Sequence, residues 1–297
     1  MSERPTTTLR RLLAGPEFLV VPGVADSLNA RLVTEEGFKA IYMTGAGTTA
    51  VRLGMPDVGL LTMDEMVDNA SRIAEASGLP LIADADTGYG GPLNVMRTIR
   101  AYERAGVAGV HIEDQQLPKR CGHLAGKTLV PAGEMAAKIR AAVDAREDPD
   151  FVLIARTDAI AVEGFEAAIE RGKVYEDAGA DVIFVEAPRT REQLAAIPPA
   201  FGVPALLNIG ASGKTPMLDA EEAKELGFRL AIYPNFLILA AIPAVRRALR
   251  ELKEKGTPAA LLNDIAGFTE LFDIVGMAEV QELEERYGVS EEARVGY

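Results

Sequence analysis

Residues 118–123, with the sequence PKRCGH, contain the chain's only cysteine, Cys121, and one of its two histidines, His123. The cations Lys119 and Arg120 directly precede the cysteine. Cationic neighbours stabilise a thiolate, so a thiol whose pKa is about 8.5 in isolation can exchange a proton near neutral pH. The spacing therefore indicates a cysteine that acts as a proton donor or acceptor.

The surroundings of Cys121 are typical of an exposed loop. A lone cysteine is usually a small buried hydrophobic residue. Here the flanking residues are polar, and Gly122 and Gly126 allow the backbone to bend close to a ligand. We therefore favour a functional interpretation of the thiol, with His123 as a candidate for orienting the substrate or the thiol.

Acidic residues stand at the ends of three strand-like runs. Asp84 and Asp86 end LIADAD, Glu113 and Asp114 end VHIED, and Glu186 follows VIFV. Because strand side chains alternate with a period of two, Asp84 and Asp86 share one face of their strand. Carboxylate ligands favour Mg²⁺, or Mn²⁺ in its place, over zinc. The alternative is that these acids cap a following helix or pair with lysine.

Eight short runs predict the strands that must position these residues, and helical spacing lies between them. The runs are continuously apolar, which is typical of parallel strands covered on both faces. The predicted strands are 18–23, 40–45, 80–86, 108–113, 151–157, 181–187, 204–209 and 229–233. The predicted helices are 26–36, 63–77, 92–105, 132–146, 163–178, 190–196, 219–226 and 236–254.

Eight βα units in 297 residues predict an α/β fold, a (β/α)8 barrel. An open doubly wound sheet is the alternative, but it calls for a glycine-rich phosphate-binding fingerprint after the first strand, and PGVADSLNA is not one. Active sites of barrels lie at the carboxyl ends of the strands. The polar residues predicted there are Tyr42, Thr44, Gly45, Asp84, Asp86, Glu113, Asp114, Arg156, Asp158, Glu186 and Asn208.

Other residues near the strand ends have two interpretations each. Arg156 either pairs with the barrel's acids or clamps a substrate carboxylate in a bidentate manner, and the two roles are compatible. Residues 42–47, YMTGAG, offer backbone N–H groups to carboxylate oxygens. Asp57, between glycine and proline, reads locally as a turn acid. His111 faces the same side of its strand as Glu113, and we interpret it as a core histidine.

Composition excludes several classes of partner. A net charge of −13 argues against nucleic acid. A single cysteine permits no intrachain disulfide and fits the cytoplasm. No apolar run approaches the roughly 20 residues of a membrane span, so we expect no membrane partner. We expect one barrel domain over 1–297, with 256–297 as a helical extension whose apolar stripe packs on a neighbouring subunit.

Taken together, these segments resemble the isocitrate lyase/phosphoenolpyruvate mutase superfamily. KRCGH at 119–123 is similar to the signature of its lyase branch, and DADTGYGGPLNV at 84–95 resembles its metal-binding segment. ARTDA and FVEAP also match, and the similarity runs from about residue 8 to 290. The resemblance implies a barrel whose last helix is exchanged between subunits, a homotetramer, and Mg²⁺ near the barrel mouth.

The resemblance also implies roles for individual residues. Asp86 matches the acid that holds Mg²⁺ most directly, and Asp57, Asp84 and Glu113 match acids that hold it partly through water. Cys121 matches the catalytic acid/base on a gating loop. The positions that bind the 2-oxo acid or line the site correspond to Tyr42, Thr44, Gly45, Ala46, Gly122, Arg156, Glu186, Asn208 and Pro234.

The implied reaction is carbon–carbon cleavage of a small anionic 2-hydroxy acid. Its hydroxyl and a carboxylate chelate Mg²⁺, which eases formation of the alkoxide. Collapse of the alkoxide gives pyruvate or glyoxylate and a carbanion. Lys119, Arg120 and His123 stabilise that second fragment, and Cys121 protonates it.

The first expectation for the substrate is 2-methylisocitrate, cleaved to pyruvate and succinate, because Phe184 and Pro234 resemble that lyase's methyl pocket. Residues 210–211 are Gly-Ala where methylisocitrate lyases tend to carry Thr-Glu, and Leu239 stands where they place an arginine for a third carboxylate. A 2,3-dimethylmalate lyase or oxaloacetate hydrolase activity is therefore a serious rival. A phosphonomutase, which needs no proton donor in this loop, and a barrel that only binds ligands are disfavoured.

Overall fold

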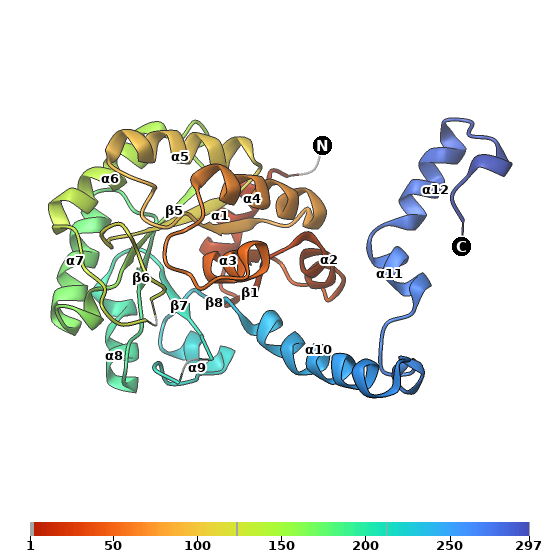
Figure 1. Cartoon of the computed structure of the whole chain (residues 1–297). Helices are drawn as coiled ribbons and strands as arrows, with labels where there is room; N and C mark the ends of the chain where they lie inside the picture. Colours follow the sequence, from red (N-terminus) through yellow and green to blue (C-terminus); the bar gives the residue numbers. More distant parts are fainter. Residues whose placement is uncertain (1–2, 123, 212, 297) are drawn as a thin grey trace. The chain divides into compact units, whose positions relative to one another are not determined.

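The eight predicted strands form a closed parallel barrel in the order β1 to β8. Figure 1 shows the chain, with β1 and β5 to β8 labelled. The structure is a computed structural model and describes residues 3–122, 124–211 and 213–296. The strands are β1 (Leu19–Val24), β2 (Ile41–Met43), β3 (Leu81–Asp84), β4 (Gly109–Glu113), β5 (Val152–Thr157), β6 (Val182–Val185), β7 (Ala205–Asn208) and β8 (Leu230–Tyr233). β8 pairs with β1, which closes the barrel and confirms the (β/α)8 prediction.

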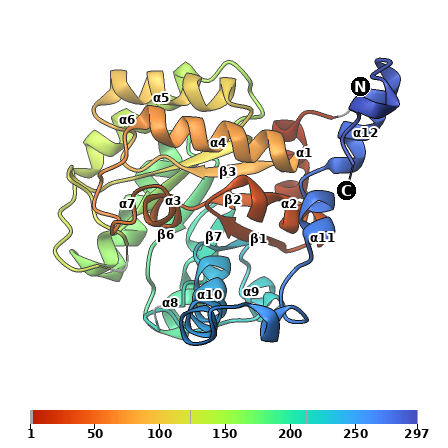
Figure 2. The same ribbon diagram turned by 45° about the vertical axis from the view of Figure 1, so that its right-hand side comes forward.

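Helices surround the strands of the barrel, as Figure 2 shows for α4, α5 and α6. The helices up to β8 are α1 (Pro5–Ala14), α2 (Ser27–Glu35), α3 (Gly45–Leu53), α4 (Met63–Ser77), α5 (Pro92–Arg104), α6 (Ala132–Ala145), α7 (Phe165–Asp177), α8 (Arg191–Ala196) and α9 (Ala220–Glu225), with 3₁₀ turns η1 (Ala159–Ala161) and η2 (Pro198–Ala200). Each helix predicted between strands is present. The sequence patterns missed α1 and α3, whose early turns are rich in Thr or Gly, residues of low helix propensity.

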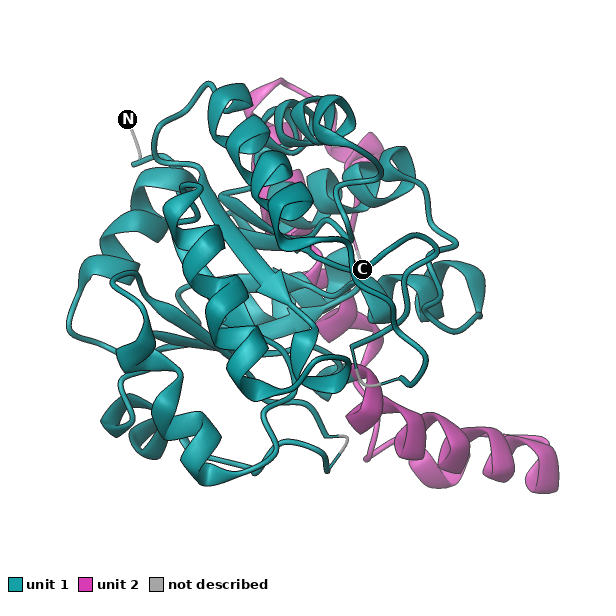
Figure 3. Cartoon of the chain, turned by 90° about the vertical axis from the view of Figure 1, so that its left-hand side faces the viewer, with its two compact units in different colours: residues 1–237 teal, residues 238–297 magenta. Residues whose placement is uncertain are grey.

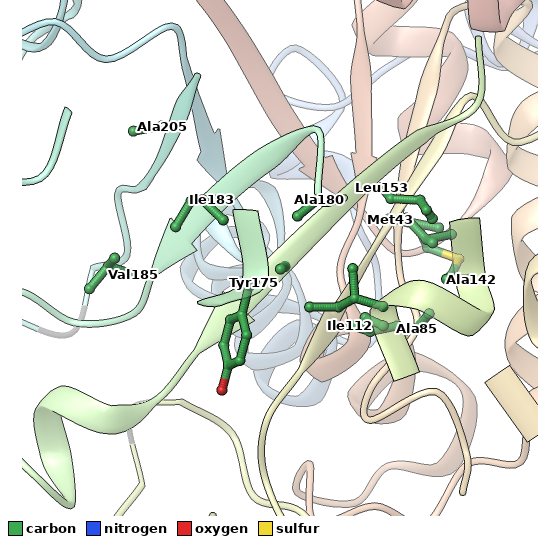
Figure 4. Close-up of a cluster of buried hydrophobic side chains, with 14 of the residues drawn as sticks. Met43, Ala85, Ile112, Ala142, Leu153, Tyr175, Ala180, Ile183, Val185 and Ala205 are labelled. Carbon is green, nitrogen blue, oxygen red and sulfur yellow. The ribbon is translucent and has the colours of Figure 1, made fainter. Parts of the chain in front are cut away.

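Two hydrophobic clusters lie on the two sides of the barrel wall. The outer cluster fills the space between strands and helices, and Figure 4 shows part of it, including Tyr175 of α7, Ala142 of α6 and Ile183 of β6. In β5, Leu153 points to this outer cluster and Ile154 to the inner one. Because inward positions recur every two residues, the inward position that follows Ile154 is Arg156, near the carboxyl end of β5.

The first helix covers the amino-terminal end of the barrel. Leu9 and Leu13 of α1 belong to the inner cluster, together with Leu19 at the start of β1. Ala40 and Ala108, which precede β2 and β4, are members of the same cluster. Because α1 closes this end with apolar side chains, the polar inward residues gather at the opposite end.

The chain divides into two compact units, residues 1–237 and residues 238–297 (Figure 3). The second contains most of α10 (Phe236–Lys255), then η3 (Ala259–Leu261), α11 (Phe268–Ile274), α12 (Met277–Arg286) and η4 (Glu291–Ala293). The division at residue 238 lies before the start of the helical extension expected over 256–297. Many of its large apolar side chains are exposed, including Leu262, Phe268 and Leu271. None of the helices among the described residues is long and apolar enough to span a bilayer.

Candidate active site

The carboxyl end of the barrel carries a ring of polar side chains, one at or near the end of each strand from β2 to β7. Each lies two residues after an inward residue of its strand: Asp84 follows Ile82, Arg156 follows Ile154, and Glu113 follows His111. The other residues of this ring are Thr44, Glu186 and Asn208, and all of the ring residues are buried. The period of two along parallel strands thus brings the predicted site residues together.

Asp84 and Asp86 adopt a strained, hydrogen-bonded turn at the end of β3. Asp86 has φ 48°, in the left-handed region that non-glycine residues avoid. Its backbone N–H donates to Asp84 Oδ1 at 2.9 Å, which helps to hold the turn. The other oxygen, Asp84 Oδ2, accepts a hydrogen bond from the N–H of Gly45 at 3.2 Å. Strain of this kind, worth about 1–3 kcal/mol, concentrates at functional sites.

The segment around Gly45 is the first turn of a helix, α3. Thr44 is its N-cap and accepts from Gly47 N, and its hydroxyl donates to Asn235 Oδ1 at 3.2 Å. Gly45 has no room for a side chain, because a Cβ there would lie 2.4 Å from Asp84 Oδ2. Of the backbone N–H groups predicted at 42–47, the first two belong to β2 and the rest to the N-terminus of α3, which favours anions.

Arg156 is the centre of a buried ion-pair network. Its Nη1 lies 3.1 Å from Glu113 Oε2, and its Nε and Nη2 donate to the two oxygens of Asp158 at 2.9 and 3.1 Å. Glu186 Oε2 lies 3.9 Å from Arg156 Nε, and Asn208 Nδ2 donates to the same oxygen at 3.1 Å. Arg156 is thus a structural partner of the barrel's acids, one of the two roles expected for it.

The segment carrying Cys121 lies over this end of the barrel. Lys119 Nζ is 2.7 Å from Asp57 Oδ1 and 2.6 Å from Asp86 Oδ1, so a loop cation bridges two acids. Cys121 is half-buried, and its N–H donates to the carbonyl of Asp57 at 3.2 Å. A Cβ on Gly122 would lie 2.4 Å from Arg156 Nη2, so the glycine permits this close approach.

The remaining residues predicted for the site differ in how close they lie to the polar ring. Tyr42 is buried and its hydroxyl is 2.8 Å from His111 Nε2, below the polar ring. Pro234 follows β8 and packs against Gly23, where a Cβ would meet its backbone. Arg120 is exposed, and its guanidinium donates to the Ala125 carbonyl of its own loop rather than to a residue of the ring. His123 lies outside the described residues.

Burial and charge shift the protonation of the acids in opposite directions. Burial raises the pKa of Asp86 to about 6, against the opposing effect of Lys119. Burial also disfavours ionised Asp84, but His111, Lys119 and Arg156 outweigh it and lower the pKa of Asp84 to about 2. The pKa of Glu113 is raised well above its usual value, chiefly by burial. Adjacent carboxyls with separated pKa values are typical of functional sites.

The acids fit a hard divalent cation in kind. Asp57, Asp84, Asp86 and Glu113 are all buried carboxylates, and Glu113 Oε1 accepts no hydrogen bond from any described residue. As they stand, no three acidic, histidine or cysteine side chains of the described part of the chain converge into a cation site. Lys119, positioned between Asp57 and Asp86, supplies positive charge there.

Three residues that received no role from the sequence contribute to this region. Asp158 anchors Arg156, and Lys127 Nζ donates to Asp158 Oδ1 at 2.7 Å. Gln115, just after β4, forms two hydrogen bonds with the backbone of Arg120. The one available signal was the position of Asp158 at a strand end.

Comparison with known proteins identifies the family. The family model described as phosphoenolpyruvate phosphomutase matches residues 9–253. The chain is 45% identical over 279 residues to 2,3-dimethylmalate lyase of Eubacterium barkeri, covering 94% of this chain and 96% of that protein. It is 43% identical over 274 residues to 2-methylisocitrate lyase of Aeropyrum pernix, covering 92% and 88%. The chain belongs to the phosphoenolpyruvate mutase/isocitrate lyase superfamily.

Solved structures place it further within that superfamily. A trigonal crystal form of 2,3-dimethylmalate lyase matches with a TM-score of 0.94 and 43% identity over 100% of both chains. Oxaloacetate acetylhydrolase with 3,3-difluorooxalacetate matches at 0.91 and 44%, covering 97% and 100%. Phosphonopyruvate hydrolase with oxalate and Mg²⁺ matches at 0.87 and 30%, covering 96% and 99%. The protein belongs to the lyase branch, a family of carbon–carbon lyases.

Proposed function

We propose that this protein is a Mg²⁺-dependent lyase that cleaves a carbon–carbon bond of a 2-hydroxy dicarboxylate, with Cys121 as the proton donor. The observation that carries the proposal is the seating of the Cys121 segment: Lys119 reaches Asp57 and Asp86, while Gly122 packs on Arg156. This arrangement brings the segment that carries Cys121 to the acids that suit a divalent cation. The relatives support the same reaction class.

Four carboxylates would hold the cation: Asp86 most directly, and Asp84, Asp57 and Glu113 around it. The buried Glu113 Oε1, which lacks a donor among the described residues, supports this assignment. When bound, Mg²⁺, or Mn²⁺ in its place, neutralises the developing charge on the hydroxyl and carboxylate oxygens of a 2-hydroxy acid. Asp57 and Asp86 also lie within ion-pair distance of the Lys119 ammonium, which balances part of their charge without metal.

The residues of the polar ring would bind the part of the substrate that becomes the 2-oxo acid. Arg156 offers a guanidinium held rigidly by Asp158, so less freedom is lost when it binds a carboxylate. Residues 44–46, at the N-terminus of α3, offer backbone N–H groups. Glu186 and Asn208 would line the site, with Pro234 at its margin.

The hydroxyl of Tyr42 would lie near the reacting oxygen. Its pKa is raised well above its usual value by burial, reinforced by Asp84, so it stays protonated and can donate a hydrogen bond. After the carbon–carbon bond breaks, the electron pair remains on the carbon next to the second carboxylate. Cys121 would deliver a proton to that carbon, and the segment would shield the carbon from water. We propose that Lys119, Arg120 and His123 stabilise the negative charge of this fragment.

A dicarboxylate such as 2,3-dimethylmalate is favoured over 2-methylisocitrate, which we retain as the second candidate. A third carboxylate requires a further cation. Position 239, which matches the arginine that binds this carboxylate in methylisocitrate lyases, is leucine. The match to 2,3-dimethylmalate lyase over nearly all of both chains supports this choice. In favour of 2-methylisocitrate, the match to 2-methylisocitrate lyase is only slightly lower.

Comparison of kcat/KM for four substrates tests the assignment. The substrates are 2,3-dimethylmalate, 2-methylisocitrate, isocitrate and oxaloacetate, each with Mg²⁺ and with detection of the 2-oxo acid or, for oxaloacetate, of oxalate. The proposal expects 2,3-dimethylmalate to give the highest value. A tricarboxylate that exceeds it by tenfold or more would show that another group binds the third carboxylate.

We further propose that the protein acts as a homotetramer in the cytoplasm, with the helices of residues 238–297 exchanged between subunits. The exposed apolar side chains of this unit, such as Phe268 and Leu271, support burial against a second copy. A reducing compartment suits a mechanism that depends on one thiol. Light scattering tests the assembly, and a monomeric active enzyme would contradict it.

A further inference from the structure

Lys127 is a buried lysine whose side chain has no part in the function proposed above. It lies on the returning side of the segment between Gln115 and Leu129, which pair in an antiparallel bridge. Gln116 N–H donates to the Thr128 carbonyl at 2.8 Å and closes the base of the segment. Lys127 therefore lies on the half of the segment that returns toward Leu129, whereas Lys119 lies on the half that leaves Gln115.

The ammonium of Lys127 joins the segment to the network around Arg156. It donates to the carbonyl of Gly122, the residue after Cys121, and to Asp158 Oδ1 at 2.7 Å. The same Asp158 holds Arg156 through two hydrogen bonds. One buried carboxylate thus fixes both the backbone beside the thiol and the guanidinium below it.

Other contacts hold the segment on the amino-terminal side of Cys121. The Gln115 side chain bonds both the N–H and the carbonyl of Arg120, at 2.9 and 2.8 Å. Lys119 bridges Asp57 and Asp86. Lys127 provides the matching contact on the carboxyl-terminal side. Its loss would free the backbone at Gly122 while the contacts of Lys119 remain.

We propose that Lys127 is a positioning residue that seats Cys121 over the site and couples this seat to the orientation of Arg156 through Asp158. The predicted effect of Lys127 on turnover rests on the proposed function, whereas its predicted effect on the position of the segment does not. A charged donor shared between a carbonyl and a buried carboxylate makes strong hydrogen bonds, because the surroundings exclude water. Lys127 does not contact the acids proposed to hold the cation.

Labelling of the single thiol tests the position of the segment independently of catalysis. Cys121 is the only cysteine, so the rate of reaction with a disulfide reagent such as DTNB reports on this segment alone. Lys127→Met removes the ammonium but retains the length of the side chain. Loss of a buried charge-assisted hydrogen bond predicts labelling at least about tenfold faster. Lys173→Met, which removes an exposed lysine paired with Glu170, is the matched control and is expected to label at the wild-type rate.

Turnover supplies the second readout. Lys127→Met is expected to lower kcat by about tenfold or more with a smaller change in KM, and Lys127→Arg to restore part of both effects because it retains a cationic donor. Equal labelling rates for the wild type and a folded Lys127→Met would overturn the proposal, as would equal acceleration in Lys173→Met. Lys127→Gln replaces the variant if it does not fold. If the wild type shows no lyase activity and Lys127→Met still labels faster than the wild type, the positioning role of Lys127 is supported and the proposed function is contradicted.

Discussion

Lys119 Nζ lies 2.7 Å from Asp57 Oδ1, although one residue follows β4 and the other lies in the loop between α3 and α4. The carbonyl of Asp57 also accepts a hydrogen bond from the N–H of Cys121. Asp57 therefore holds the thiol-bearing segment through both its side chain and its backbone. Asp57, which from the local sequence is an ordinary turn residue, thus connects this segment to the barrel.

Gly122 is predicted to be required for the seating of this segment. In Gly122→Ala the added Cβ would lie 2.4 Å from Arg156 Nη2 and 2.8 Å from Glu186 Cδ, so the segment must move. Keeping the seated conformation would cost about 1–3 kcal/mol. Because the segment can move away instead, we expect turnover to fall about tenfold or more with little change in Tm. Gly133→Ala, in α6 with no atom within 4 Å of the new Cβ, is the control for both measurements. Wild-type turnover in Gly122→Ala would contradict the seated arrangement.

Mg²⁺ is predicted to stabilise the folded protein through Asp86. A ligand that binds only the folded state at about 100 times its Kd adds about 2.7 kcal/mol, seen as a higher Tm with MgCl₂ than with EDTA. Asp86→Asn should abolish this shift, and asparagine tolerates the left-handed backbone at this position. Asp64→Asn, at an exposed acid, should retain it. A full Mg²⁺ shift in Asp86→Asn would place the cation elsewhere.

His111 is predicted to reduce stability in acid. Burial lowers the pKa of His111 to about 4 from 6.5, despite the opposing charge of Asp84. Between these values the unfolded chain binds the proton and the folded chain does not, so the free energy of unfolding decreases as the pH falls from about 6.5 toward 4. Integrated to about pH 5, the loss is about 2 kcal/mol.

Urea unfolding of wild type and His111→Gln, in EDTA at about pH 7.5 and pH 5, measures this difference. The comparison is needed because burial raises the pKa values of Asp86 and Glu113, and these acids therefore favour the folded state as the pH falls. Wild type should lose about 2 kcal/mol more than the variant. An equal loss in both proteins would mean that His111 is not held neutral.

The barrel and its polar ring follow from local patterns in the sequence. Continuous apolar runs predicted all eight strands, and the period of two placed Asp84, Glu113 and Arg156 at the barrel mouth. The resemblance carried by the segment around Cys121 predicted the superfamily, which the comparisons confirm. These features depend on residues that are near one another in the chain or on motifs of a few residues.

The contacts across the site could not be predicted in the same way. Lys119 pairs with Asp57 across 62 residues, and Lys127 pairs with Asp158 across 31. Such pairs depend on how loops fold over the barrel, which neither periodicity nor propensity encodes. The helix α3 was missed because its N-terminal Gly-Ala-Gly reads as a loop, whereas Thr44 caps it and Asp84 accepts from its first N–H.

The central claim is that Cys121 is the proton donor of a carbon–carbon lyase, and Cys121→Ser tests it most directly. Serine retains the size of the side chain but is far too weak an acid, and loss of a general acid costs about 10²–10⁴ in rate. We predict that release of 2-oxo acid from 2,3-dimethylmalate with Mg²⁺ falls by that factor in Cys121→Ser while KM and Tm change little. Turnover at the wild-type rate in the folded variant would contradict the account.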